Sequence, residues 1–280
     1  MAALTAAKGG APLSRAIDDY PEGIVLPVDK PFRWTSADVI RKIKFAAARH
    51  FGKHNLKVGH AGTLDPLATG VLIVCIGKAT KLAESIQKSD KEYIAGISFG
   101  ATTPSYDLEK PIDATFPTEL VNKGSILKAL EGFLGEQEQV APLFSAKSVD
   151  GIRAYELARK LYRSGGSLDE KAESLLSRQK INISGLEMIS FDPDGPEAPA
   201  PEAAEGASGR INVCDNSALH LPTATVRIAC SKGTYIRAFA RDLGEALGSG
   251  AHLSSLRRTA CGGFRVENSL CLDEALALFS

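Results

Sequence analysis

The sequence predicts an α+β fold built around a mixed sheet. Val71–Ile76 is a continuous apolar run of strand length, typical of a strand that is buried on both faces. Segments with helical and strand-like patterns also alternate along the chain without the regular β–α–β spacing of a doubly wound sheet. At 280 residues, the chain is within reach of one large domain.

The expected elements follow one another from the N-terminus. Residues 1–20 mix Ala, Gly, Pro and charged residues without periodicity, and we expect a flexible tail there. A strand is expected over 23–28, and a helix begins near Ala37 after a cap at Thr35 or Ser36. Beyond a glycine-rich loop at 59–70 and the strand at 71–76, we expect helices at 79–87, 125–134, 151–161, 235–247 and 270–278, and strands at 92–99, 181–191 and 223–230.

Composition limits the class of protein. No run approaches the ~20 apolar residues that span a bilayer, and the first residues lack the pattern of a signal peptide. The number of cysteines is odd and none forms a Cys-x-x-Cys pair, so we expect reduced thiols and neither a disulfide framework nor a zinc ribbon. These cysteines are Cys75, Cys214, Cys230, Cys261 and Cys271. The sequence therefore predicts a cytoplasmic protein without a metal or cofactor.

Charge is unevenly distributed along the chain, although 33 Lys and Arg balance 33 Asp and Glu overall. Residues 23–60 hold eight Lys and Arg against two Asp, a net charge of +6. Residues 221–265 hold seven against two acidic residues, a net charge of +5, whereas residues 186–220 have a net charge of −6. Two interpretations remain open at this point: ordinary solvated faces, or two basic segments that together bind phosphates.

The densest chemical signal is the segment 59–70, Gly-His-Ala-Gly-Thr-Leu-Asp-Pro-Leu-Ala-Thr-Gly. Its glycines permit positive φ angles and a close approach of the backbone to a ligand. Asp65 is its single carboxylate, lies before a proline that restricts its backbone, and precedes a buried strand. This placement suits a carboxylate held in one geometry for nucleophilic chemistry. An ordinary Asp-Pro turn is the alternative, and the segment does not match a P-loop.

A second segment, Cys-Ser-Lys-Gly-Thr-Tyr-Ile-Arg at 230–237, leads from a strand through a turn into a helix. Arg237 falls in the first helical turn, where the helix dipole disfavours a cation. An ion pair with a carboxylate such as Asp65 would offset that cost and keep the carboxylate ionised. The alternative interpretation is that Arg237 lies at the surface and that Tyr235 packs in the core.

These two segments, together with Asp-Lys-Pro at 29–31 and Ser-Asp-Lys-Glu-Tyr at 89–93, resemble the TruB family of pseudouridine synthases. The resemblance runs in order over residues 23–279. It implies a mixed, largely antiparallel central sheet flanked by helices, with an RNA-gripping insertion. It also implies isomerisation of uridine 55 in the T-loop of tRNA by an aspartate-dependent, base-flipping mechanism, without a cofactor.

The resemblance assigns roles to the reactive core. Asp65 matches the catalytic aspartate, and Arg237 matches the arginine that pairs with it. Tyr93 matches the tyrosine that stacks on the target base. Whether Asp65 attacks the base, attacks the sugar or removes a sugar proton stays open.

Four further positions match residues around that core. Leu256 matches an apolar residue that lines the pocket. His60 matches the histidine that takes the place of the flipped base in the RNA fold. Tyr235 and Lys30 match residues that pack against the site and support it. The partner implied is the T-arm of tRNA, with a monomeric enzyme that needs no protein partner.

Some segments depart from the family pattern. Pro104 stands where an acid is common and Lys110 where a glycine is usual, although Asp107 is retained. The segment Pro-Leu-Phe-Ser-Ala-Lys at 142–147 resembles the start of the RNA-gripping insertion, which we expect at 142–180. Residues 192–220 are expected to be a polar, acidic loop insertion. We expect residues 21–280 to form the catalytic domain, without the C-terminal PUA domain that many relatives carry.

Two rival functions remain to be separated from this one. An RNA chaperone would fold tRNA without catalysis and would not need Asp65. An aspartate-nucleophile glycosidase would need a second carboxylate as general acid, and the 59–70 segment offers none.

Overall fold

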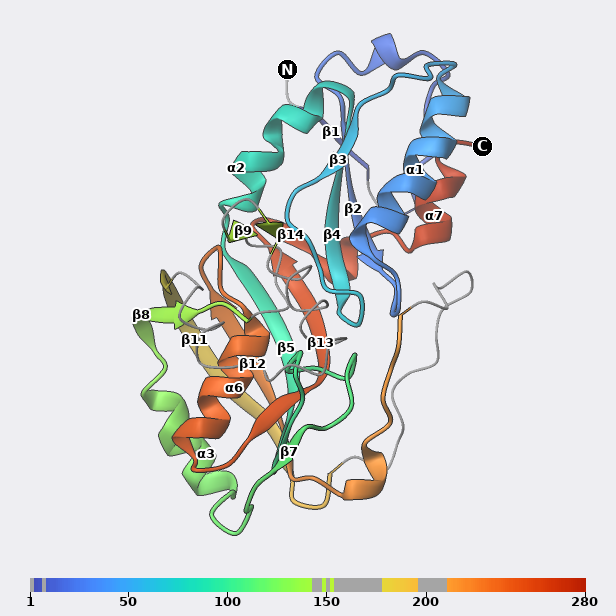
Figure 1. Ribbon diagram of the computed structural model, residues 1–280. Helices are drawn as coiled ribbons and strands as arrows, with labels where there is room; N and C mark the ends of the chain where they lie inside the picture. Colours follow the sequence, from blue (N-terminus) through green and yellow to red (C-terminus); the bar gives the residue numbers. More distant parts are fainter. Residues whose placement is uncertain (1–2, 7–8, 143–147, 150–151, 154–177, 196–210) are drawn as a thin grey trace. The chain divides into compact units, whose positions relative to one another are not determined.

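The computed structural model of the protein describes residues 3–6, 9–142, 148–149, 152–153, 178–195 and 211–280 (Figure 1). The chain divides into two compact units, which are described separately. Unit 1 comprises Met1–Tyr93, Pro201–Ile211 and Leu256–Ser280, and unit 2 comprises Ile94–Ala200 and Asn212–Ser255. Strands β5 (Lys91–Phe99) and β13 (Ala251–Cys261) each contribute residues to both units.

Unit 1 is organised by a mixed sheet centred on β4 (Thr69–Ile76). Strand β2 (Ile24–Lys30) runs antiparallel to β4 along its full length. Strand β3 (Val58–His60) pairs antiparallel with the end of β4, while β13 pairs parallel with its start. Short strands β1 (Leu4–Thr5) and β14 (Phe264–Arg265) extend the sheet beside β2 and β13. Every residue of β4 after the first is buried, which confirms the prediction of a fully buried strand.

Helices cover this sheet. Helix α1 (Ser36–His50) begins with a capping box between Thr35 and Asp38, which confirms Thr35 as one of the two predicted caps. Its buried positions recur every three or four residues, and it packs against α7 (Leu272–Ala277), which also contacts β2 (Figure 1). The segment predicted as one helix at 79–87 is a 3₁₀ helix, η2 (Gly77–Leu82), followed by α2 (Ala83–Gln87).

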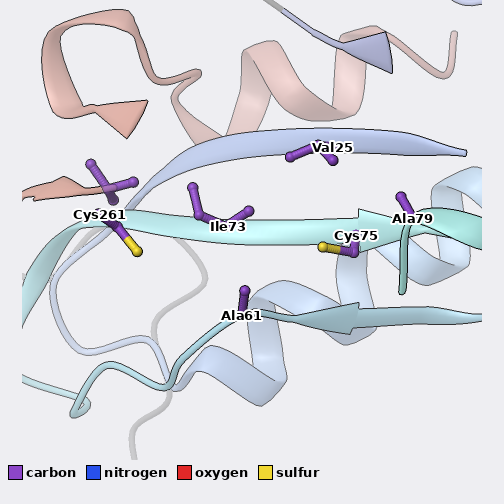
Figure 2. Close-up of a cluster of buried hydrophobic side chains, with 7 residues drawn as sticks. Val25, Ala61, Ile73, Cys75, Ala79 and Cys261 are labelled. Atoms are coloured by element: carbon purple, nitrogen blue, oxygen red, sulfur yellow. The ribbon is translucent and has the colours of Figure 1, made fainter. Parts of the chain in front are cut away.

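One face of the β4 strand forms a small apolar core (Figure 2). Ile73 and Cys75 are two residues apart and therefore point to the same face of the sheet. Val25 of β2, Cys261 of β13 and Ala61, just after β3, pack on the same cluster. Burial raises the pKa of the Cys75 thiol to about 11, so this thiol is protonated at neutral pH. The cluster fixes the start of the loop that follows β3 against the central strand.

Unit 2 contains an antiparallel sheet in which β11 (Arg178–Asp192) lies between β12 (Thr223–Cys230) and β8 (Gly135–Val140). Helix α3 (Lys123–Glu131) packs against α6 (Ile236–Ala246) and β11. The rings of Phe133 and Phe239 meet edge to face, with centroids 5.3 Å apart. The other elements among the described residues of unit 2 are the strand pairs β6 (Ala101–Thr102) with β7 (Ala114–Thr115) and β9 (Ser148–Val149) with β10 (Ile152–Arg153), and the 3₁₀ helix η3 (Ser217–Leu219).

Several elements differ from the expectations. Strands β8 and β13 were not among the predicted elements. The first twenty residues, expected to be a flexible tail, include β1 and the 3₁₀ helix η1 (Ile17–Asp19). Of the helix expected at 151–161, Ile152–Arg153 forms strand β10, and the rest lies outside the described residues. Most of the insertion expected at 142–180 and the middle of that at 192–220 lie outside them too, so the domain boundaries stay predictions.

No helix in the described part of the chain combines the length and the apolar character needed to cross a bilayer. In unit 1, the 3₁₀ helix η4 (Val266–Asn268) leads into α7.

Candidate active site

The loop between β3 and β4 holds Asp65 half-buried, between residues that are anchored in the core. Leu64 is 4% exposed and Leu67 is 9% exposed, so the apolar side chains on both sides of the aspartate are buried. The carbonyl of Asp65 accepts a hydrogen bond from the amide of Ala68 at 3.1 Å, which closes a turn just before β4. The core thus determines the position of the backbone that carries the carboxylate.

Lys30, at the end of β2, holds the residue that follows Asp65. Its ammonium has no exposed surface and donates to the carbonyls of Pro31, Trp34 and Pro66 at 3.0, 2.6 and 3.1 Å. Burial lowers the pKa of Lys30 to about 7, and the negative charge of Asp65 is the largest influence in the opposite direction. Lys30 thus lies beside the aspartate loop, and its role in supporting the site stays a prediction.

Ser36 holds the residue that precedes Asp65. Its hydroxyl donates to the carbonyl of Leu64 at 3.0 Å and accepts from the amide of the same residue at 3.0 Å. Ser36 is 3% exposed and is the first residue of α1, so the helix fixes the hydroxyl in place. The sequence suggests only a capping role for this serine, because its partner lies 28 residues away.

Arg258 of β13 holds the start of the same loop. Its guanidinium is 1% exposed and donates to the carbonyls of Val71, Gly62 and Thr63 at 2.7, 3.2 and 3.4 Å. Gly70 permits this arrangement, because a Cβ on Gly70 would lie 2.1 Å from the Arg258 carbonyl oxygen. The φ angle of Gly70 is also +100°, which favours glycine.

A partly buried ion pair lies next to this arrangement, at the start of β4. Arg257 donates to the two carboxylate oxygens of Asp29 at 2.6 and 3.2 Å, a bidentate geometry. The same carboxylate accepts from the amide of Gly70 at 3.1 Å, and Arg257 also donates to the Thr69 hydroxyl at 3.2 Å. In the sequence both residues were counted as charges, and Asp29 also belonged to the Asp-Lys-Pro motif, but neither was assigned a role in the site.

Three other predicted site residues belong to unit 1. His60 ends β3, and burial together with the positive charge of Arg258 lowers its pKa, so its imidazole is neutral at pH 7. Tyr93 is 8% exposed in β5, and Leu256 is half-buried in β13. Among the predicted residues, unit 1 thus contains Lys30, His60, Asp65, Tyr93 and Leu256.

The other two predicted residues belong to unit 2. Tyr235 caps α6, and its amide and carbonyl exchange hydrogen bonds of 2.9 and 3.1 Å with the side chain of Gln139. Arg237 is 5% exposed and donates to the Ser105 carbonyl at 3.0 Å, with its Nε 4.0 Å from a carboxylate oxygen of Asp107. Asp107 is the acid retained in the segment that departs from the family pattern. The pairing of Arg237 with Asp65 stays a prediction.

The described residues contain no group of three or more His, Cys, Asp or Glu side chains that could hold a metal ion. What unit 1 provides instead is a carboxylate on a loop held by three buried polar side chains. We call Lys30, Ser36 and Arg258 the loop clamp. Their bonds to backbone atoms of residues 62–66 restrict the motion of Asp65, which is the arrangement that nucleophilic or base catalysis requires.

Comparison with known families and proteins identifies the relatives of this chain. Residues 49–198 match the TruB family pseudouridylate synthase N-terminal domain, and residues 237–278 match the tRNA pseudouridylate synthase B C-terminal domain. A protein of Phocaeicola vulgatus named tRNA pseudouridine synthase B is 46% identical over 255 residues, which cover 91% of this chain and 92% of the relative. A protein of Thermus thermophilus with the same name is 41% identical over 88% of this chain and 75% of its own.

Solved structures share the fold. A chain in the crystal structure of a Cbf5–Nop10–Gar1 complex has a TM-score of 0.59 and 26% identity, covering 98% of this chain and 60% of its own. A chain in an archaeal box H/ACA Nop10–Cbf5 complex has a TM-score of 0.55 and 22% identity, covering 92% of this chain. This chain spans only 54% of the latter's length. These similarities confirm the predicted α+β fold, and together with the family matches they show that the chain is an isomerase that belongs to the TruB family of pseudouridylate synthases.

Proposed function

We propose that the protein converts uridine 55 in the T-loop of tRNA to pseudouridine, with Asp65 as the catalytic residue. The observation that carries this proposal is the clamped loop, which fixes the backbone on both sides of a single carboxylate. The names of the relatives, tRNA pseudouridine synthase B, support the choice of substrate and of position.

The reaction breaks a glycosidic carbon–nitrogen bond, rotates the uracil and rejoins it to the sugar through a ring carbon. Attack on the base, attack on the sugar and removal of a sugar proton each require Asp65 as the ionised carboxylate. We propose that Arg237 keeps this carboxylate ionised, since a nearby guanidinium favours the charged form. The clamp lets the carboxylate meet the nucleoside without first ordering its loop.

The remaining predicted residues serve the binding of a flipped base. Unstacking a base from a folded RNA loop costs a few kcal/mol, and stacking on an aromatic ring recovers ~1–3 kcal/mol. We assign that ring to Tyr93 and the apolar wall of the base pocket to Leu256. We assign His60 to the space that the flipped base leaves in the RNA, a role that suits its neutral imidazole. Tyr235 and Lys30 support the site.

The binding of the tRNA T-arm is proposed to rest on the two basic segments, residues 23–60 and 221–265. Phosphate contacts release counterions, so we expect the affinity for tRNA to fall steeply as salt is added. The insertion at 142–180 is proposed to grip the RNA, and we expect a monomeric enzyme that works in the cytoplasm without an obligate partner.

The test is a tritium-release assay on unmodified tRNA labelled in its uridines. Asp65→Asn removes the charge while keeping the shape, and we expect it to abolish release while retaining tRNA binding. Asp273→Asn, an exposed aspartate in the first turn of α7, is the matched control and should react like the wild type. Full activity of Asp65→Asn would overturn the assignment of the catalytic residue.

A further inference from the structure

A cavity of about 770 Å³ lies in unit 1, at the end of β4 opposite to the Asp65 loop. The Asp65 loop leads into β4 at Thr69, whereas Gly77 and Lys78 of the cavity follow its last residue, Ile76. Eight strand residues at ~3.3 Å each separate the two ends by roughly 23 Å. The cavity is therefore not part of the proposed active site.

Four lysines line this cavity, and one acid accompanies them. Lys53, Lys57, Lys78 and Lys81 are all exposed, and Asp18 lies 3.4 Å from the ammonium of Lys53. That pair leaves an excess of three positive charges around one concave surface. Such a surface attracts anions with several charges, and phosphate groups are the common biological case.

Backbone contacts fix the segments that carry the lysines. The amide of Gly77 donates to the carbonyl of Lys57 at 2.8 Å, which joins the approach to β3 to the start of η2. Gly23 lies so close to η2 that a Cβ on it would be 2.3 Å from the amide nitrogen of Ala79. Lys57 and Lys78 thus extend from neighbouring, well-packed backbone, which favours joint binding of one ligand.

The lining of the cavity also has an apolar part. It includes Ile17, Leu56 and the ring of Tyr20. Tyr20 is fixed at both ends, because its hydroxyl accepts from the amide of Ser14 at 2.7 Å and its ring meets that of Phe51 at 6.1 Å between centroids. A cavity lined both by apolar side chains with a fixed aromatic ring and by a cluster of cations suits a ligand that carries a planar ring and phosphates.

We infer that this cavity binds a nucleotide, with the phosphates among the four lysines and the base against the wall of Ile17, Tyr20 and Leu56. Its volume lies within the range of small-molecule sites. The ligand is either a free nucleotide or an unpaired nucleotide within an RNA. None of the residues that this inference uses is assigned to the reaction at Asp65, whereas Lys53 and Lys57 also belong to the basic segment 23–60 that is proposed to bind tRNA.

Calorimetric titration of the full-length protein with ADP tests the inference. We expect saturable binding in the micromolar to millimolar range, and weaker binding of pyrophosphate, which lacks the base. Lys57→Gln combined with Lys78→Gln should weaken ADP binding about fivefold or more, since each exposed ion pair makes a modest contribution. Lys88→Gln, an exposed lysine of unit 1 outside the cavity, is the matched control.

Absence of ADP binding, or binding that the double variant leaves unchanged, would overturn the inference. Equal affinity for pyrophosphate and ADP would overturn the role of the apolar wall. Displacement of ADP by tRNA assigns the site to an RNA nucleotide, whereas binding of both together assigns it to a free nucleotide. Asp65→Asn should bind ADP like the wild type, so failure of the reaction at Asp65 and failure of this site give different results.

Discussion

The substitution Ser36→Ala tests whether the loop clamp matters for catalysis. It removes one hydroxyl and with it two hydrogen bonds of 3.0 Å, to the amide and to the carbonyl of Leu64. Leu64 is 4% exposed, so water does not readily replace the lost partner. A buried polar group left unsatisfied costs ~1–3 kcal/mol, and we expect the two together to lower the free energy of unfolding by about 2–4 kcal/mol.

The same substitution should slow the reaction. A displacement of ~1 Å at a reacting group can reduce the rate by about 100-fold, and Asp65 adjoins the residue that is released. We expect kcat to fall about 10- to 100-fold with little change in KM, because the substitution leaves the RNA-binding surface intact.

The assays are urea unfolding followed by circular dichroism, and single-turnover formation of pseudouridine at a temperature where both proteins are folded. Ser85→Ala, on α2, is the matched control. The hydroxyl of Ser85 is exposed and donates to the carbonyl of Leu82 at the end of η2, not to the loop that carries Asp65. If Ser36→Ala kept the stability and the single-turnover rate of the wild type, the reasoning about the clamp would be refuted.

Three further predictions concern stability, measured by urea unfolding. Gly70→Ala should destabilise the protein by more than about 2 kcal/mol, because the new Cβ would overlap the backbone of β13. The control Gly59→Ala places its Cβ in open space and should cost less than about 1 kcal/mol. Equal losses of stability in the two variants would contradict the close contact at Gly70. Since burial lowers the pKa of Lys30 from 10.5 to about 7, the unfolded chain holds more protons between those values, and stability should rise with pH there. Lys30→Met should remove that rise, on the order of 5 kcal/mol, and a rise that persists in this variant would refute the assignment. Thr35→Ala removes the side-chain cap of α1 and should cost about 1 kcal/mol, so an unchanged free energy of unfolding would contradict the capping role.

Elements set by local pattern could be predicted from the sequence. The apolar run at 71–76 became the buried strand β4, and the cap before α1 formed at Thr35. Strand β13 was missed because its sequence holds two serines and two arginines and shows no regular alternation. Its buried Arg258 is satisfied by carbonyls that lie 187 to 196 residues away in the chain, and no local pattern reports such partners.

The residues of the candidate site also differ in whether a local sequence pattern reveals them. Asp65 stood out because a lone carboxylate before a proline, among glycines, is a local signal. The place of Arg237 in a first helical turn suggested a carboxylate partner such as Asp65. The roles of the other residues came from the family resemblance: Lys30, His60, Tyr93, Tyr235 and Leu256. Ser36 and Arg258 could not be found from the sequence, since their hydrogen-bond partners are main-chain atoms of a distant loop.

Mapping of pseudouridine at nucleotide resolution tests the central claim most directly. An unmodified tRNA transcript is incubated with the enzyme and treated with a carbodiimide, and pseudouridine is then located by the stops of reverse transcription. The account predicts one strong stop that marks position 55 after reaction with the wild type and with Asp273→Asn, and none after reaction with Asp65→Asn. A stop at position 55 after reaction with Asp65→Asn, or no stop there with the wild type, would contradict it.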